Sequence, residues 1–173
     1  MVRFLCKIIP WTEGILTLRL LFMHVRIRSA GKGAMSRSGA ILNDIYDAYR
    51  AKNLDWLGTY LPDDFCHVLH IPATVHPLAG LCQGKKAVLD RWRVCIAPYE
   101  FLSFDTSSLL IEEDRAAVEI AFHYRHKITG EELMTTKANI WVLEEGWPVK
   151  LSEYYDVGAL QAFLRTIGGK IEV

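Results

Sequence analysis

The sequence predicts an α+β fold, a cone-shaped roll in which a curved antiparallel sheet wraps three N-terminal helices. Between residues 38 and 96, apolar residues recur mainly at helical spacing. From residue 99 onward they alternate with polar residues, as in strands that bury one face. Short turns such as Thr129-Gly130 join these strands into a meander. A meander of this kind coils strongly, and helices laid on its concave face would enclose a cavity.

The first 34 residues differ from the rest of the chain. They carry six basic side chains and one acidic side chain, whereas the whole chain of 173 residues has a formal net charge of zero. Their one apolar run, Ile15–Met23, is interrupted by Arg19 and is too short for a bilayer, which needs about 20 residues. Of a secretory signal, a transit peptide and an upstream start choice, we favour the last, with translation from Met35. Residues 35–173 then form a single domain.

Three helices are expected in the first half of this domain. Ser38 is the expected cap of the first helix, and Asn53 caps a short second helix that ends at Pro62. The third helix is expected over Lys85–Ile96 and is closed by Pro98. The apolar residues at helical spacing are Ile41, Leu42, Ile45, Tyr46 and Tyr49 in the first helix, Leu54, Leu57 and Leu61 in the second, and Val88, Trp92 and Cys95 or Ile96 in the third.

One early strand and four later strands are expected. The early strand is Phe65–Ile71, and a loop with Pro72, Pro77, Gly80 and Gly84 follows it. The later strands are Phe101–Ile111, Ala116–Ile128, Leu133–Leu143 and Val149–Tyr155. Asp156 is the expected cap of a last short helix.

The strand Leu133–Leu143 has two different faces. One face carries Lys137, Asn139, Trp141 and Leu143, and the other carries Met134, Thr136, Ala138, Ile140 and Val142. The second set is too apolar for a face in water. We therefore expect a homodimer that covers this face of the sheet.

The last strand places a carboxylate on an apolar face. Glu153 shares its face with Val149, Leu151 and Tyr155. A buried carboxylate is unfavourable unless it is paired, hydrogen-bonded or protonated, so Glu153 is a candidate for acid–base chemistry. Lys137 on the neighbouring strand could pair with it and keep it ionised. Left unpaired, Glu153 would have a raised pKa and could act as an acid.

Composition and charge exclude several kinds of partner. Residues 35–173 carry a net charge of −5 and no basic stripe, which argues against nucleic acid. The four cysteines have no metal-ligand spacing, and we expect them to be reduced, in a cytoplasmic protein. The spacing of His67, His70 and His76 is poor for one metal site. We expect no metal, no cofactor and no membrane association.

Several short segments resemble a known superfamily. They are Lys52–Leu57, Leu61–Phe65, Pro77–Gly80, Gln83–Lys85 and Glu153–Asp156. With the elements above, residues 36–164 resemble SnoaL-like and ketosteroid isomerase-like domains of the nuclear transport factor two-like superfamily. The resemblance implies a cavity for a small hydrophobic cyclic or carbonyl compound, with cofactor-free proton transfer, isomerisation or cyclisation as the reaction. The alternative is a non-catalytic ligand-binding or dimeric interaction domain.

The resemblance also implies roles for individual residues. Ketosteroid isomerase-like enzymes carry a general-base aspartate near the end of the first strand, where this chain has no acid but offers His67 or His70. These two histidines are three residues apart, so at most one faces inward, where it would exchange protons with Glu153. Tyr46 or Tyr49 would supply the oxyanion-binding tyrosine, and Asn139 the second donor.

A second comparison is with the limonene epoxide hydrolase-like branch. Its arginine and aspartate on one strand match Lys137 and Asn139 here, and its other aspartate matches Glu153. Lysine lacks the guanidinium fork and asparagine lacks the acid, so the same hydrolysis is not expected.

The residues expected to bind the substrate are Tyr49, Lys137, Trp141, Trp92, His76 and Tyr155.

Overall fold

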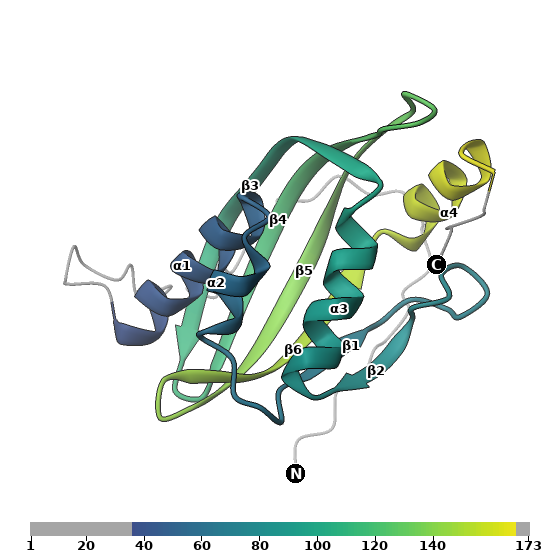
Figure 1. Cartoon of the computed structure of the whole chain (residues 1–173). Helices are drawn as coiled ribbons and strands as arrows, with labels where there is room; N and C mark the ends of the chain where they lie inside the picture. Colours follow the sequence, from purple (N-terminus) through teal and green to yellow (C-terminus); the bar gives the residue numbers. More distant parts are fainter. Residues whose placement is uncertain (1–35, 169–173) are drawn as a thin grey trace, which may run out of the picture. The chain divides into compact units, whose positions relative to one another are not determined.

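The computed structural model describes residues 36–168 as four helices and one six-stranded sheet (Figure 1). The helices are α1 (Arg37–Arg50), α2 (Leu54–Gly58), α3 (Lys85–Ile96) and α4 (Val157–Thr166). The strands are β1 (Cys66–Leu69), β2 (Gly80–Gln83), β3 (Tyr99–Glu112), β4 (Arg115–His126), β5 (Glu132–Glu144) and β6 (Trp147–Tyr155). The predictions made for residues 1–34 and the start at Met35 lie outside the described residues.

The sheet is mixed. Its strand order is β2-β1-β6-β5-β4-β3, and β3 to β6 form the predicted antiparallel meander. β1 joins the other side of β6 in parallel, with Cys66 opposite Lys150 and Leu69 opposite Glu153. The predicted α+β cone is confirmed, and the parallel pair is an addition to it.

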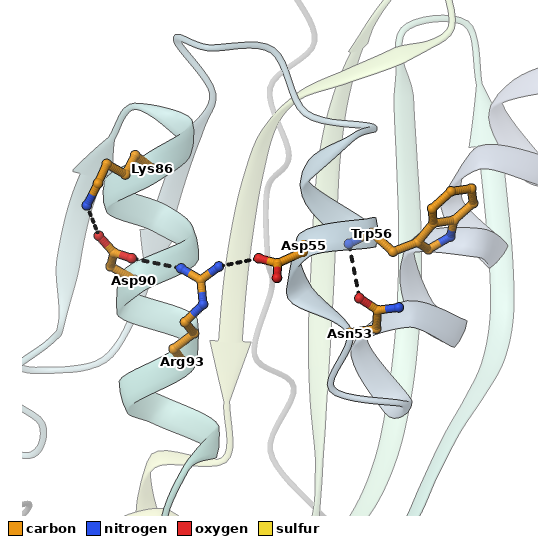
Figure 2. A network of polar contacts seen from close by, with 6 residues as sticks. All are labelled: Asn53, Asp55, Trp56, Lys86, Asp90 and Arg93. Atoms are coloured by element: carbon orange, nitrogen blue, oxygen red, sulfur yellow. Dashed lines mark hydrogen bonds and ion pairs between the residues drawn. The ribbon is translucent and has the colours of Figure 1, made fainter.

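Two local predictions differ from the structure. The cap of α1 is Ser36, whose hydroxyl accepts from the backbone N–H of Gly39 at 3.2 Å, so the prediction of Ser38 is wrong. β2 lies within the segment predicted as a loop, and it forms because its backbone pairs with β1. The cap of α2 is confirmed, since Asn53 Oδ1 accepts from the Trp56 N–H at 3.1 Å (Figure 2).

The helices α2 and α3 lie against each other. Arg93 bridges Asp90 at 2.8 Å and Asp55 at 2.6 Å, which links the two helices at the surface (Figure 2). Exposed ion pairs contribute less than about 1 kcal/mol each. The packing is also close: a β-carbon on Gly58 would lie 2.8 Å from Leu89 Cδ1, so a larger residue there would make the end of the Leu89 side chain shift.

The helices cover one face of the sheet, and α4 lies where β6 ends (Figure 1). The side chains of β5 that point toward the helices are buried, including Lys137, Asn139, Trp141 and Leu143, as predicted. On the opposite face Met134 is 78% exposed and Ala138 is also exposed. None of the helices within residues 36–168 combines the length and the apolar character that a bilayer crossing requires.

Candidate functional site

A cavity of about 70 Å³ lies between the helices and the inner face of the sheet. Its walls are mainly apolar and aromatic, and α4 contributes Leu160, Phe163 and Leu164. A second space of about 20 Å³, called the inner space below, lies beside Tyr46, Lys137, Asn139 and Trp141. The side chains that line both spaces are Tyr49, Trp92 and Glu153. Glu153 therefore borders both spaces.

Glu153 is paired with Lys137. The Lys137 ammonium lies 2.9 Å from Glu153 Oε2, and the two side chains are only 2% and 10% exposed. Burial acts to raise the pKa of Glu153, but Lys137 and the other polar groups around the carboxylate outweigh it and hold that pKa below its ordinary value. Glu153 is thus ionised at neutral pH. Of the two alternatives left by the sequence, the structure has the paired, ionised carboxylate and not the unpaired carboxylic acid.

A chain of hydrogen bonds orients Glu153 from the inner side. Trp141 Nε1 donates to the Tyr46 hydroxyl at 2.8 Å. The hydroxyl needs an acceptor for its own proton, which Asn139 Oδ1 provides at 3.1 Å, and Asn139 Nδ2 then donates to Glu153 Oε2 at 3.2 Å. Burial raises the pKa of Tyr46 far above its ordinary value. Tyr46 and Asn139 are therefore engaged with each other and with Glu153.

His67 is the strand-one histidine that faces inward. It lies on β1, is 1% exposed and lines the cavity. Its Nδ1 accepts from Trp92 Nε1 at 3.1 Å and faces Arg91 Nη1 at 3.3 Å. Burial lowers the pKa of His67 to about 4, although the charge of Glu153 acts in the opposite direction. The imidazole is therefore neutral at physiological pH.

His70 does not belong to the site. It is exposed on the opposite face of the sheet, where its ring stacks on Tyr154 with 4.2 Å between ring centroids. The prediction that either histidine could act is thus resolved against His70, because successive side chains of a strand alternate between its faces.

The remaining predicted residues surround the cavity at different depths. His76 lines it, and its Nδ1 accepts from the Leu78 N–H at 3.1 Å. Burial, with a smaller contribution from Arg91, lowers the pKa of His76. Tyr155 lies at the wall, where its hydroxyl accepts from Lys137 at 3.3 Å. Trp141 lines only the inner space.

Sequence reasoning missed Tyr124 and Arg91. Tyr124 lines the cavity from β4, and its buried hydroxyl forms no hydrogen bond of ordinary length within residues 36–168. Burial is the main reason that its pKa lies well above the ordinary value. Arg91 is 8% exposed and donates to the Gly80 carbonyl at 2.9 and 3.1 Å. Arg91 follows Val88 by three residues, so helical spacing could have placed it on the inner face of α3.

The site offers little for metal or thiol chemistry among the described residues. No group of three His, Cys, Asp or Glu side chains within residues 36–168 could hold a metal ion. Burial raises the pKa of Cys95 to about 12, so this cavity-lining cysteine is a neutral thiol.

Comparison with known families covers most of the described chain. A family model for the SnoaL-like domain matches residues 42–150. No curated protein matches the chain in sequence.

Solved structures share the fold at low sequence identity. A proposed isomerase from Rhodopseudomonas palustris is 20% identical, with a TM-score of 0.63 over 75% of this chain and 98% of its own. A proposed polyketide cyclase from Xanthomonas campestris pv. campestris is 15% identical, with a TM-score of 0.61 over 75% and 98%. A Catenulispora acidiphila protein with a ketosteroid isomerase-like fold, in complex with trimethylamine, is 16% identical, with a TM-score of 0.60 over 70% and 89%.

Proposed function

Because the chain belongs to the SnoaL-like domain family, we propose that it binds a small, largely apolar carbonyl compound and removes a proton from it. The observation that carries the proposal is Glu153, an ionised carboxylate buried at the wall of the cavity. Proton transfer by a positioned carboxylate needs no cofactor. Solved structures of this fold include a proposed isomerase and a proposed polyketide cyclase.

The surroundings of Glu153 suit a base that acts on a carbon acid. Lys137 and Asn139 both contact Oε2, and the Tyr155 hydroxyl also hydrogen-bonds the carboxylate, so these groups hold it in place at the cavity wall. The apolar walls match a carbon skeleton and exclude water, which strengthens the electrostatic interactions inside.

The reaction is a balanced proton transfer. Glu153 takes a proton from the carbon next to the carbonyl group, and the electron pair of the broken C–H bond forms an enolate with its negative charge on oxygen. Return of the proton, to the same or another carbon, restores the carboxylate. Addition of the enolate carbon to a second carbonyl of the same molecule would give ring closure instead.

We expect Glu153→Gln to slow proton abstraction by about 10²–10⁴-fold, because an amide has the shape of the carboxylate but cannot take the proton. The assay follows deuterium exchange at the α-carbons of cyclopentanone in D₂O by proton NMR. The full chain is compared with protein-free buffer. The Glu153→Asp side chain keeps the negative charge but is one methylene shorter, so the carboxylate lies farther from the ligand. The exchange rate of Glu153→Asp should therefore lie between those of the wild type and Glu153→Gln.

The control for this experiment is Glu144→Gln, an exposed carboxylate at the end of β5, which should exchange at the wild-type rate. Equal rates in the wild type and a folded Glu153→Gln variant would contradict the proposal. Binding of cyclopentanone without any exchange would favour the alternative, a non-catalytic binding domain. The ion pair with Lys137 favours that alternative, because it lowers the basicity of Glu153.

We also propose that two copies associate through the outward face of β4 and β5. This face exposes Met134 and Ala138 and includes the half-buried Ile140. Ala138→Glu should convert a dimer into a monomer, because it places two like charges near a symmetric contact. Light scattering after size-exclusion chromatography measures the mass. Glu145→Lys, in the turn after β5, is the matched surface control, and a wild-type monomer at all concentrations would contradict the proposal.

A cytoplasmic location remains part of the proposal. The cysteines of the described region, Cys66, Cys82 and Cys95, are free thiols, as expected in a reducing compartment.

A further inference from the structure

Two buried polar atoms at the wall of the cavity form no hydrogen bond of ordinary geometry within residues 36–168: His67 Nε2 and the Tyr124 hydroxyl. The Tyr124 hydroxyl still has the Tyr49 hydroxyl beside it as a hydrogen-bond partner. Buried polar groups are nearly always satisfied, so His67 Nε2 needs an explanation, and a ligand in the cavity would supply one.

The protonation of His67 follows from its neighbours. Nδ1 lies 3.1 Å from Trp92 Nε1 and 3.3 Å from Arg91 Nη1. An indole and a guanidinium can only donate, so Nδ1 must accept and cannot carry a proton. The single proton of the neutral ring is therefore on Nε2. His67 presents an N–H donor to the cavity, and its one lone pair is already used on the other side of the ring.

This arrangement removes His67 as a proton acceptor. A base at Nε2 would require the proton to move to Nδ1, where it would meet the N–H groups of Trp92 and Arg91. The sequence-based expectation that a strand-one histidine exchanges protons with Glu153 therefore does not fit this geometry. A neutral imidazole can instead polarise a carbonyl group as a hydrogen-bond donor.

We propose that His67 Nε2–H is the subsite for an acceptor oxygen of the ligand, with Trp92 as the positioning residue that fixes its tautomer. The inference rests on the proposed function and deepens it. The preferred ligands are ketones, enones and esters, and a hydrocarbon of the same shape is discriminated against. When Glu153 removes a proton, the negative charge develops on the oxygen that His67 already contacts.

The charges around the subsite favour the same assignment. Arg91 donates to backbone carbonyls and has no carboxylate within ion-pair distance in residues 36–168. Together with Lys137, Arg91 makes two buried cations, whereas Glu153 is the one buried carboxylate within residues 36–168. An enolate oxygen at His67 would offset the excess positive charge, whereas a cationic ligand would increase it.

The Tyr124 hydroxyl is a second contact point. It lies close enough to the Tyr49 hydroxyl for each to affect the pKa of the other. A hydroxyl donates and accepts, so Tyr124 does not select for an acceptor oxygen as the N–H of His67 does. The proposal therefore depends on His67 alone.

The first test reads the tautomer directly. Long-range ¹H–¹⁵N NMR of the full chain should show a neutral His67 ring with its proton on Nε2 between pH 6 and 8. Adding cyclopentanone should shift the Nε2 resonance, and methylenecyclopentane, which replaces the oxygen by CH₂, should not. A proton on Nδ1, or equal shifts with both compounds, would overturn the proposal.

The second test compares two amides at position 67. The Gln side chain reaches as far as Nε2 and keeps a donor there, whereas Asn reaches only as far as Nδ1 and keeps an acceptor for Trp92. We expect the wild type and His67→Gln to bind cyclopentanone about tenfold more tightly than methylenecyclopentane. We expect His67→Asn to lose this preference. His70→Gln, on the outer face of the same segment, is the matched control and should behave as the wild type.

The two proposals can fail separately. One outcome is a preference for the ketone that depends on position 67, with no deuterium exchange that depends on Glu153. This outcome would support the oxygen subsite and overturn the proposed reaction. The other outcome is deuterium exchange that depends on Glu153 and is unchanged in His67→Asn. This outcome would overturn the role of His67 and support the proposed reaction.

Discussion

Replacement of Lys137 by methionine is expected to lower the free energy of unfolding by about 3–5 kcal/mol, since it leaves Glu153 buried without a counter-ion. Lys137 is 4% exposed and its ammonium lies over the rings of Tyr49 and Tyr155, so methionine, an unbranched side chain of similar length, fills much of the same space. Urea denaturation at pH 7, followed by circular dichroism, measures the change. The same variant should raise the pKa of Glu153, because burial is then no longer opposed by the ammonium.

A double variant separates charge from packing. Lys137→Met combined with Glu153→Gln should regain most of the lost stability, because no uncompensated charge remains in the interior. Lys86→Met is the matched control, since Lys86 pairs with Asp90 at 2.6 Å but is 91% exposed. It should change the free energy of unfolding by less than about 1 kcal/mol. Equal losses for Lys137→Met and Lys86→Met would show that the inner pair is not desolvated.

Acidification should destabilise the protein through His67. The pKa of His67 is about 4 in the folded state, against 6.5 for the free side chain. As the pH falls from 7 toward 4, the unfolded chain takes up a proton that the folded protein does not, so the free energy of unfolding decreases. The gap between the two pKa values corresponds to about 3 kcal/mol at full effect.

The charges that face His67 fix the pH window. Glu153 on β6 raises the pKa of His67, whereas Arg91 on α3, Lys137 on β5 and the nearby His70 lower it. Glu153 has a lowered pKa, so its own contribution is present above 4.5 and is lost only as the pH falls through the folded value. Between pH 6.5 and 4.5 the change in the free energy of unfolding therefore comes mainly from histidine.

Urea denaturation at a series of pH values measures this effect. His67→Asn should flatten the dependence of the free energy of unfolding between pH 6.5 and 4.5, while retaining an acceptor for Trp92. A residual slope is expected from His76, whose pKa burial also lowers. His70→Gln should keep the wild-type slope. An unchanged slope in His67→Asn would contradict a buried neutral imidazole.

Alternation along single strands made the inner face of the sheet predictable. The period of two in Leu133–Leu143 and Val149–Tyr155 assigned Lys137 and Glu153 to the same buried face, and the turn at Glu145-Gly146 made their strands neighbours. The ion pair between them could therefore be anticipated from local sequence.

The choice between His67 and His70 could not be made in the same way. β1 has only four residues, and its register is fixed by β6, far away in the sequence. The edge strand β2 also has only four residues, too few for a sequence pattern to identify it, and it depends on pairing with β1. The roles of Tyr46, Arg91 and Tyr124 depend on which groups meet in three dimensions, and spacing along one element does not contain that information.

The parallel pairing of β1 with β6 has a consequence for the order of folding. β3, β4, β5 and β6 are joined by short turns, so their hairpins close with little loss of chain entropy. Cys66 meets Lys150 only after most of the domain has been made, and such long-range contacts form slowly. Lys137 and Glu153 can thus come together in a local hairpin, whereas His67 reaches them only through the long-range pairing of β1 with β6. The site is therefore assembled from one local contact and one long-range contact.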